Sequence, residues 1–378
     1  MTVLVVTNDF PPRRGGIQTF VYELVRRLPA DQVVVFASTW RGCDEFDAEQ
    51  PFRVVRHPVR VLLPTPRVRA RAQLLMTEVG ATSVLFGAAA PLGLLGPALR
   101  ARGADHLVAL THGHEAGWAQ LPGARRVLRR IGDGVDTVTY LGEYTRRRIS
   151  DVLSPQAAHR MARLTPGVDA RVFHPSSDHG KALRARHGLG ARPVVVCVSR
   201  LMPRKGQDTL LEAWPSVREQ VPGAALLLVG GGPYRGRLTA SVDRLGLADD
   251  VVLTGSVEAS DLPGYFAAGD VFAMPCRTRN GGLDVEGLGI VYLEASASGL
   301  PVVAGDSGGA PDAVVPGRTG YVVPGGDAAA LARRLVALLS DHDLASRLGA
   351  AGREWVLEEW QWESQASRLA GLLGMSTA

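Results

Sequence analysis

Residues 284–304 read DVEGLGIVYLEASASGLPVVA, a stretch that places Glu286 and Glu294 eight positions apart around a glycine-containing apolar run. The two glycines that follow the first glutamate disfavour a helix interior. We therefore expect Glu286 on a loop and a helix that begins near Ile290 and carries Glu294 on its second turn. The apolar run PVVAGD comes next and is typical of a buried strand. The stretch predicts a loop, a helix and a strand in succession.

The same alternation of strand and helix patterns runs through the whole chain. In the first half, β-rich runs such as TVLVVTN and HLVALTH alternate with helical segments such as IQTFVYELVRRL. In the second half, PVVVCVSR, AALLLVGGG and VVLTGSV alternate with segments such as LLEAWPSVREQ. Strands and helices that take turns predict open, parallel, doubly wound sheets. We expect an α/β protein with two Rossmann-like sheets that face each other across a cleft.

The chain length and the positions of proline and glycine residues predict where the two halves divide. A chain of 378 residues exceeds the usual size of a single hydrophobic core. We predict an N-terminal domain over residues 1–168 and a second domain over residues 169–356, joined by a linker with proline and glycine. A Trp-rich amphipathic helix pattern near the C-terminus has no strand after it. We expect its last part, residues 357–378, to return to the N-terminal domain.

Positive charge gathers in the first half of the chain. Residues 1–168 hold 22 arginines against 14 acidic residues, a net charge of +8, whereas the rest of the chain carries −3. The arginines cluster in residues 56–75, 125–130 and 146–148. Arginine alternating with Val, Leu and Ala is typical of a surface that binds anionic lipid, and a solvated arginine-rich face explains it equally well. Nucleic acid is a weaker hypothesis because these clusters hold few aromatic residues.

The cysteines, the N-terminal sequence and the length of the apolar runs indicate the cellular compartment. The three cysteines are widely scattered and show no metal-binding or CxxC spacing, which favours a reducing cytosol. The N-terminus MTVLVVTNDF lacks the features of a signal peptide, and no apolar run of about 18 residues is present. These features favour a cytosolic protein that is soluble or peripheral to a membrane.

The helix expected near Ile290 also predicts a kind of ligand. Its first turn offers unpaired N–H groups and the positive end of the helix dipole, which suit a phosphate. The carboxylates of Glu286 and Glu294 suit hydroxyl groups. A sugar nucleotide, which is both phosphorylated and polyhydroxylated, is the first candidate. Taken alone, the two glutamates are explained as well by an exposed loop and a solvated helix face.

Two further loops of the second half favour the same ligand. RLMPRKGQD follows a predicted strand and places Arg200 and Lys205 where a diphosphate needs charge compensation; a basic surface loop is the simpler alternative. LVGGGP and GSVEASDLP contain Gly230 and Val257, and loops of this sort can receive a nucleobase through backbone groups. Ligands of parallel sheets bind at the carboxyl ends of the strands, where we expect these loops.

The first half contributes two candidate loops. NDFPPRRGGIQ brings Gly16 to the start of a predicted helix, whose bare amides suit an anion. THGHE follows a predicted strand and contains His112, His114 and Glu115. Their spacing lacks the helical HExxH pattern of zinc enzymes. We therefore favour a polar or catalytic histidine over a metal site.

The chain resembles glycosyltransferase family 4, the retaining enzymes of GT-B fold, in six segments: GGIQ, HGHE, SRLMPRKGQDTLLEA, LVGGGP, GLDVEGLGIVYLEASASGLPVVAGDSGGAPD and GRTGYVVP. The resemblance covers nearly the whole chain and includes the E-x7-E and R-x4-K spacings. NDFPPRRGGIQ and THGHE are similar, more narrowly, to actinobacterial mannosyltransferases that transfer mannose from GDP-mannose to phosphatidylinositol monomannoside.

This resemblance implies a role for each donor-side residue. Glu286 would contact the hydroxyls of the donor sugar, and Glu294 would contact the ribose hydroxyls. Arg200 and Lys205 would neutralise the leaving diphosphate without a metal ion, because no DxD motif lies on an equivalent loop. The remaining donor contacts would come from Gly230, Val257, Gly287, Leu288, Gly289 and Ile290.

The resemblance also implies an acceptor side. Gly16 would approach the diphosphate from the N-terminal domain, and His112, with His114 as its competitor, would face the reacting sugar. Asp9 and Gln18 would lie near the acceptor. The implied donor is GDP-mannose, used with no metal or other cofactor, and the implied acceptor is a phosphatidylinositol-type lipid at an anionic membrane surface.

Three alternatives stay open. A family 4 enzyme that uses another nucleotide sugar and a soluble acceptor would carry the same motifs. A non-hydrolysing sugar-nucleotide epimerase has a similar two-domain fold and would need no lipid. A non-catalytic lipid-binding protein would keep the fold, but the intact Glu286, Glu294, Arg200 and Lys205 argue against it.

Overall fold

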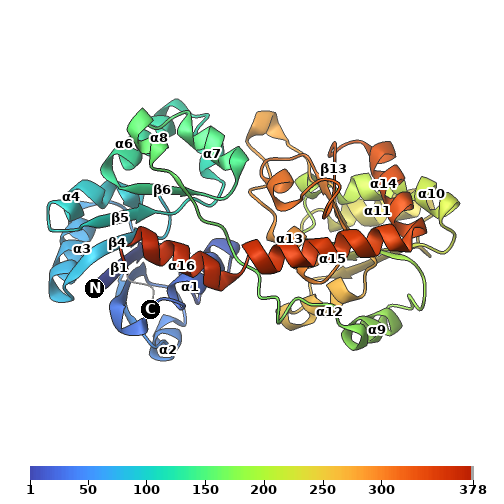
Figure 1. The fold of residues 1–378 in the computed structure, drawn as a ribbon, viewed down its shortest axis with the longest axis horizontal. Helices are drawn as coiled ribbons and strands as arrows, with labels where there is room; N and C mark the ends of the chain where they lie inside the picture. Colours follow the sequence, from blue (N-terminus) through green and yellow to red (C-terminus); the bar gives the residue numbers. More distant parts are fainter. Residues whose placement is uncertain (376–378) are drawn as a thin grey trace. The chain divides into compact units, whose positions relative to one another are not determined.

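A computed structural model describes residues 1–375 of the chain, which divides into two compact units. Unit 1 comprises Met1–Gly167 together with the C-terminal segment from Trp362, and unit 2 comprises Val168–Gln361. Each unit is an α/β sandwich with a parallel sheet at its centre (Figure 1). The prediction of an α/β protein with two doubly wound sheets is confirmed.

The sheet of unit 1 has seven strands in the order β3-β2-β1-β4-β5-β6-β7, all parallel. Its strands are β1 Thr2–Thr7, β2 Val33–Ser38, β3 Arg53–His57, β4 Ala81–Phe86, β5 His106–Ala109, β6 Thr137–Tyr140 and β7 Ala162–Arg163. The central strands are buried on both faces, as covered parallel sheets require. Their runs of Val, Leu and Phe allowed them to be predicted from the sequence.

Helices cover both faces of this sheet (Figure 1). They are α1 Gly16–Val25, α2 Cys43–Ala48, α3 Pro66–Glu78, α4 Gly96–Arg100, α5 Glu115–Trp118, α6 Pro122–Gly134, α7 Glu143–Ser150, α8 Pro155–His159 and α16 Trp362–Leu372, with short 3-10 turns η1 Ala30–Gln32 and η2 Leu92–Leu95. The C-terminal helix α16 packs beside α1. Among residues 1–375, none of the helices combines the length and hydropathy that a membrane crossing requires.

The sheet of unit 2 has six parallel strands in the order β10-β9-β8-β11-β12-β13. Its strands are β8 Val194–Val198, β9 Ala225–Val229, β10 Val251–Gly255, β11 Val271–Met274, β12 Val302–Gly305 and β13 Gly320–Val323. Its helices are α9 Ser177–Arg186, α10 Gln207–Gln220, α11 Arg235–Leu245, α12 Leu262–Ala267, α13 Ile290–Ala297, α14 Ala328–Ser340 and α15 His342–Glu359, with 3-10 turns η3 Pro203–Lys205, η4 Ala259–Asp261, η5 Asn280–Gly282 and η6 Ala310–Ala313.

Strand order reverses once in each sheet. The reversal lies between β1 and β4 in unit 1, and between β8 and β11 in unit 2. At such a switch point the loops that leave the two strands diverge, and open α/β sheets bind ligands there. The motifs singled out in the sequence follow β1 and β5 in one unit and β8, β9, β10 and β11 in the other.

The Trp-rich C-terminal pattern differs from expectation in one respect. Its sequence suggested one continuous helix, but α15 ends at Glu359 and α16 begins at Trp362. The carbonyl of Trp360 accepts a hydrogen bond from the Val168 amide at 2.7 Å, and Gln361 forms a parallel bridge with Val168. Backbone pairing with a segment nearly 200 residues away interrupts the helix, and helical periodicity carries no sign of such pairing.

Candidate active site

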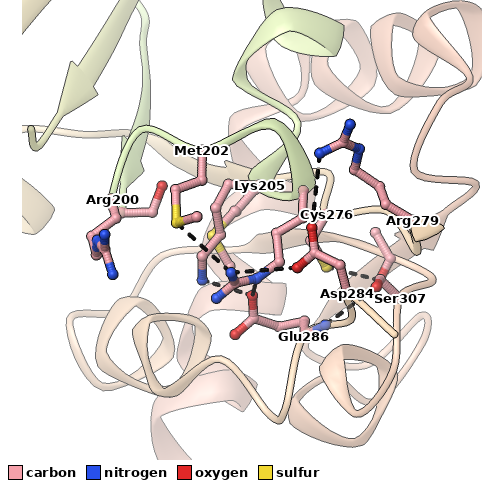
Figure 2. A network of polar contacts seen from close by, with 12 residues as sticks. Arg200, Met202, Lys205, Cys276, Arg279, Asp284, Glu286 and Ser307 are labelled. Atoms are coloured by element: carbon pink, nitrogen blue, oxygen red, sulfur yellow. Dashed lines mark hydrogen bonds and ion pairs between the residues drawn. The ribbon is translucent and has the colours of Figure 1, made fainter. Parts of the chain in front are cut away.

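The switch point of unit 2 brings together Lys205, in the loop after β8, and Glu286, in the loop after β11. The Nζ of Lys205 donates a hydrogen bond to Oε2 of Glu286 at 2.6 Å, and both residues are buried (Figure 2). Arg204 adds a second cation, 3.7 Å from Glu286 and 3.6 Å from Asp284. A buried carboxylate is stable only with such compensation. The arrangement is a preformed charged site.

Local backbone chemistry explains why these two loops meet. Gly206 ends η3 with a φ of +77°, and a side chain there would run into the carbonyl of Pro275. Glycine therefore lets the β8 loop approach the end of β11. The Glu286 amide donates to Oγ of Ser307 at 3.3 Å, and the Glu286 carbonyl accepts from Gly309 at 2.9 Å. These bonds fix the backbone beneath the carboxylate.

A second ion pair joins the start of α10, which follows the Lys205 loop, to the loop after β11. Arg277 donates to both carboxylate oxygens of Asp208, at 2.9 and 2.6 Å, and its amide donates to the carbonyl of Arg204 at 2.8 Å. Burial alone would raise the pKa of Asp208, but the bonds and charge of Arg277 outweigh burial and lower it. Tyr234, from the loop after β9, also donates to Asp208 at 2.9 Å. The pair braces the loop that carries Lys205.

Helix α13 begins at Ile290, as the sequence predicted, so the first-turn amides lie directly after Glu286 in the chain. Gly289 holds the entry turn with a φ of +80°, and a side chain there would crowd Tyr292. The Tyr292 hydroxyl donates to the Met274 carbonyl at 2.7 Å, which ties the helix to the end of β11. Amides of a first turn have no intrahelical acceptor and suit an anion.

Glu294 lies one turn into α13, half-buried. Burial of its carboxyl raises the pKa to about 7. The group is therefore partly protonated near neutral pH, and a ligand that donates hydrogen bonds would favour the ionised form.

A hollow of about 330 Å³ lies beside the β8, β9 and β10 loops. It is lined by Val198, Ser199, Arg200, Val229, Gly230, Gly231, Ser256, Val257 and Leu262. Three predicted donor-side residues, Arg200, Gly230 and Val257, thus share one cavity. The Arg200 side chain is exposed, points away from Lys205 and Glu286 (Figure 2), and forms no ion pair within residues 1–375.

Unit 1 carries a smaller polar group after β1. The side-chain Nε2 of Gln18 donates to Oδ1 of Asp9 at 2.6 Å, and the backbone amide of Asp9 donates to Oγ1 of Thr7 at 2.9 Å. The two residues predicted on the acceptor side therefore touch each other. Gly16 is exposed as the first residue of α1, and open space surrounds its Cα, so its backbone is free to approach a ligand.

The THGHE loop lies after β5 in the same unit. His112 is half-buried, and its Nε2 lies 2.6 Å from the carbonyl of Gly87. A carbonyl accepts only, so Nε2 carries the proton and Nδ1 is left as the acceptor of the neutral ring. Burial lowers the His112 pKa. His114 is exposed, with its ring parallel to that of His112 at 6.3 Å.

Comparison with known proteins decides the family. The profile described as Glycosyltransferase Family 4 matches residues 14–172, and that described as Glycosyl transferases group 1 matches residues 181–355. A GDP-mannose-dependent alpha-(1-6)-phosphatidylinositol monomannoside mannosyltransferase of Mycolicibacterium smegmatis is 53% identical over 98% of both chains. This chain belongs to that glycosyltransferase family.

Two further comparisons support this placement of the glycosyltransferase. A GDP-mannose-dependent monoacylated alpha-(1-6)-phosphatidylinositol monomannoside mannosyltransferase of Corynebacterium glutamicum is 44% identical, over 98% of this chain and 97% of the other. The crystal structure of Anabaena HepE in complex with UDP has a TM-score of 0.84 at 20% identity, covering 99% of this chain and 100% of that one. The latter likeness concerns the fold and confirms the GT-B prediction.

Burial limits the reactivity of the cysteines in the glycosyltransferase. All three cysteines are buried. Burial raises the pKa of the Cys197 thiol to about 12, and burial with the nearby charge of Glu286 raises that of Cys276 to about 11. Both thiols stay protonated at neutral pH and are poor nucleophiles. Residues 1–375 contain no cluster of three or more His, Cys, Asp or Glu side chains placed to hold a metal ion.

The structure of the glycosyltransferase also reveals site residues that sequence reasoning missed. Arg204 and Asp284 flank the Lys205–Glu286 pair, and Arg277 and Asp208 brace it. Their separation in sequence, 69 positions for Arg277 and Asp208, hides the contact. The available signal was indirect: Arg204, Asp208 and Asp284 lie within three positions of Lys205 or Glu286, and Arg277 lies three positions after the end of β11.

Proposed function

We propose that this protein transfers mannose from GDP-mannose to a phosphatidylinositol mannoside with retention of configuration, at an anionic membrane surface. The observation that carries the proposal is the buried Lys205–Glu286 pair at the β8/β11 switch point, directly before the first turn of α13. Relatives that are 44% and 53% identical over nearly the whole chain carry this activity in their names. The chain matches them along 97% and 98% of their own length.

The donor occupies unit 2 in this proposal. Lys205 and the exposed Arg200 compensate the diphosphate charge, and the amides of Gly287 to Ile290 bind the sugar and diphosphate. Glu286 accepts hydrogen bonds from sugar hydroxyls, and Glu294 accepts them from the ribose. The base enters the hollow near Gly230 and Val257.

Sugar transfer then proceeds by charge stabilisation. The acceptor hydroxyl attacks the anomeric carbon from the face that the nucleotide leaves, so configuration is retained without an enzymic nucleophile. Negative charge grows on the departing diphosphate while the sugar becomes oxocarbenium-like. Preorganised cations and helix-end amides lower the barrier because they match charge that develops only in the transition state. The cations take the role that a metal ion plays in other glycosyltransferases.

Unit 1 receives the acceptor in this proposal. His112 faces the reacting sugar, and Asp9 and Gln18 lie near the acceptor, with Gly16 at the diphosphate. A peripheral position at the inner face of the plasma membrane is supported by the exposed surface of α3 and α6. Six arginines are exposed there, Arg67 and Arg69 in α3 and Arg125, Arg126, Arg129 and Arg130 in α6. Exposed apolar side chains accompany them: Leu74 in α3, Val61 and Leu63 in the segment before α3, and Leu121 directly before α6. Such a surface suits anionic lipid.

Donor screening by thermal shift, followed by product mass with lipid acceptors, tests the proposal. We expect GDP and GDP-mannose to raise the melting temperature more than UDP, UDP-glucose or ADP, because a ligand that binds only the folded state stabilises it. Phosphatidylinositol monomannoside should then gain one hexose. Stabilisation by UDP-glucose instead, or an epimer formed from sugar nucleotide without acceptor, would overturn the proposal.

A further inference from the structure

Glu115 is a fully buried carboxylate for which the proposed transfer has no use. It is 0% exposed, and its Oε2 accepts a hydrogen bond from the His112 amide at 2.9 Å. Its other oxygen, Oε1, is buried and has no hydrogen-bond partner among the described residues. A buried carboxylate with an unpaired oxygen costs free energy. Such a group at the end of β5 calls for a reason other than stability.

The surroundings of Glu115 supply that reason. Its unpaired oxygen lies 3.4 Å from Nε2 of His114, and its bonded oxygen holds the backbone of His112. The His112 ring is fixed on its other sides by the Gly87 carbonyl and by Phe20, which packs edge-on at 5.4 Å. One carboxylate therefore bonds the His112 backbone and lies beside the His114 ring.

We propose that Glu115 is a positioning residue for sugar transfer: its carboxylate fixes the His112 backbone and sets a negative charge beside both histidines of the HGH segment. The inference rests on the proposed role of His112 at the reacting sugar. Glu115 itself is buried and touches no substrate. It acts by holding the His112 backbone, which aims the ring, and by favouring a proton on Nδ1 of that ring.

The charges around His112 make this role specific. Burial lowers its pKa most strongly, Glu115 raises it, His114 lowers it, and Asp9 raises it. The Gly87 carbonyl, which accepts from the protonated ring, also raises it. Without Glu115, burial and His114 would act against Asp9 and Gly87 alone, and His112 would ionise only at lower pH.

Titration of the histidines by NMR in the full-length protein tests the coupling directly. Glu115→Gln keeps an acceptor for the His112 amide and removes the charge, so we expect the His112 midpoint to fall by roughly one pH unit. His114→Gln removes the opposing influence and should raise the midpoint. Asp136→Asn is the matched control, because Asp136 accepts from the Leu107 amide at 2.7 Å near the start of the same strand and should leave His112 unchanged.

The rate measurements separate positioning from folding. Glu115→Ala also removes the acceptor for the His112 amide, and we expect turnover to fall about a hundredfold with the KM for GDP-mannose nearly unchanged. Glu115→Gln should shift the acid limb of the rate profile by the same amount as the NMR midpoint.

Three results would overturn the inference. An unchanged His112 midpoint in Glu115→Gln, or an equal shift in Asp136→Asn, would mean that Glu115 is merely structural. If the His112 midpoint shifts but the pH–rate profile does not, the protonation state of His112 does not control transfer, and Glu115 then has no role in transfer through that histidine. The thermal-shift screen of nucleotides tests the proposed donor independently of these three results.

Discussion

The two candidate sites of this glycosyltransferase differ in how they handle charge. In unit 2, the loops after β8 and β11 bury a carboxylate against two cations and leave a third cation, Arg200, exposed. In unit 1, the loops after β1 and β5 hold a histidine whose pKa is lowered and a carboxylate, Asp9, bonded to an amide. The first site pairs its buried carboxylate with cations at close range, whereas the carboxylates of the second, Asp9 and Glu115, accept hydrogen bonds from uncharged amides.

This difference matches the two kinds of substrate in the proposed reaction. A nucleotide diphosphate carries fixed negative charge, so its site needs cations in place before it arrives. An acceptor hydroxyl is neutral, and a site for it needs groups that accept or share a proton. We therefore expect unit 2 residues to govern nucleotide binding and stabilisation of the leaving diphosphate, and unit 1 residues to affect transfer without affecting nucleotide binding.

The largest effect should follow removal of the central cation. Lys205→Ala takes away charge at the departing diphosphate, and turnover should fall by about a thousandfold. The variant also leaves Glu286 with Arg204 alone, so the free energy of unfolding should fall by up to about 3 kcal/mol. Steady-state kinetics and chemical denaturation measure the two losses.

The double variant Lys205→Met with Glu286→Gln separates these effects, because it should recover stability without recovering turnover. Arg200→Ala should lose activity while keeping stability, since its side chain is exposed. Loss of wild-type activity in EDTA, restored by a divalent ion, would contradict the assignment of charge compensation to Arg200 and Lys205.

The glutamate pair divides binding from chemistry within unit 2. Glu286→Ala should lower turnover about a hundredfold, because sugar contacts strengthen in the transition state. Glu294→Ala should weaken GDP affinity about tenfold, because ribose contacts persist through the reaction. Kinetics together with calorimetric titration of GDP distinguish the two. Equal losses of GDP affinity in both variants, with turnover unaffected, would refute the division.

Membrane docking should depend on unit 1 and leave the nucleotide site untouched. Each exposed arginine contributes up to about 1 kcal/mol beside anionic lipid. Substituting Arg67, Arg69 and Arg71, or the four arginines of α6, should weaken binding to anionic vesicles at least tenfold. GDP affinity should stay constant.

Vesicle co-sedimentation across a salt series supplies the control for docking. The Debye length falls from about 10 Å at 0.1 M salt to about 3 Å at 1 M, so arginine-driven binding should weaken with salt. If neutral and anionic vesicles bind the wild type alike, these arginines are a solvated face.

The smallest effect concerns pH. Burial raises the pKa of Glu294 to about 7 in the donor-free protein, and ribose hydroxyls favour the ionised carboxylate. GDP affinity should therefore rise several-fold between about pH 6 and about pH 8. The raised pKa also means that stability present below the ordinary value of 4.5 is lost as pH rises through 7. Glu294→Gln should flatten both profiles; an affinity profile that stays steep would assign the titration to another group.

Much of the fold and the location of both candidate sites could be predicted from the sequence, because they depend on the pattern of neighbouring residues. Apolar runs predicted the strands, and the loops that follow them proved to carry Lys205, Glu286 and His112 at the carboxyl ends of the sheets. The start of α13 at Ile290 followed from the two glycines before it. Fold and site location are local consequences of periodicity and turn chemistry.

The rest depends on contacts between distant segments. Nothing near Asp208 in the sequence signals that Arg277 will pair with it, or that Glu115 will be buried beneath His112 rather than exposed beside His114. The break between α15 and α16 likewise arises from backbone pairing with Val168. Such contacts are set by tertiary packing, which periodicity does not encode.

Calorimetric titration of GDP into four full-length variants tests the division of labour most directly. Lys205→Ala and Glu294→Ala should each weaken GDP binding about tenfold or more, because both remove direct contacts with the nucleotide. Asp9→Asn and His112→Gln should bind GDP as the wild type does while losing most of their turnover. If either unit 1 variant weakened GDP binding as much as Lys205→Ala, the claim that charge in unit 2 alone governs the nucleotide would be contradicted.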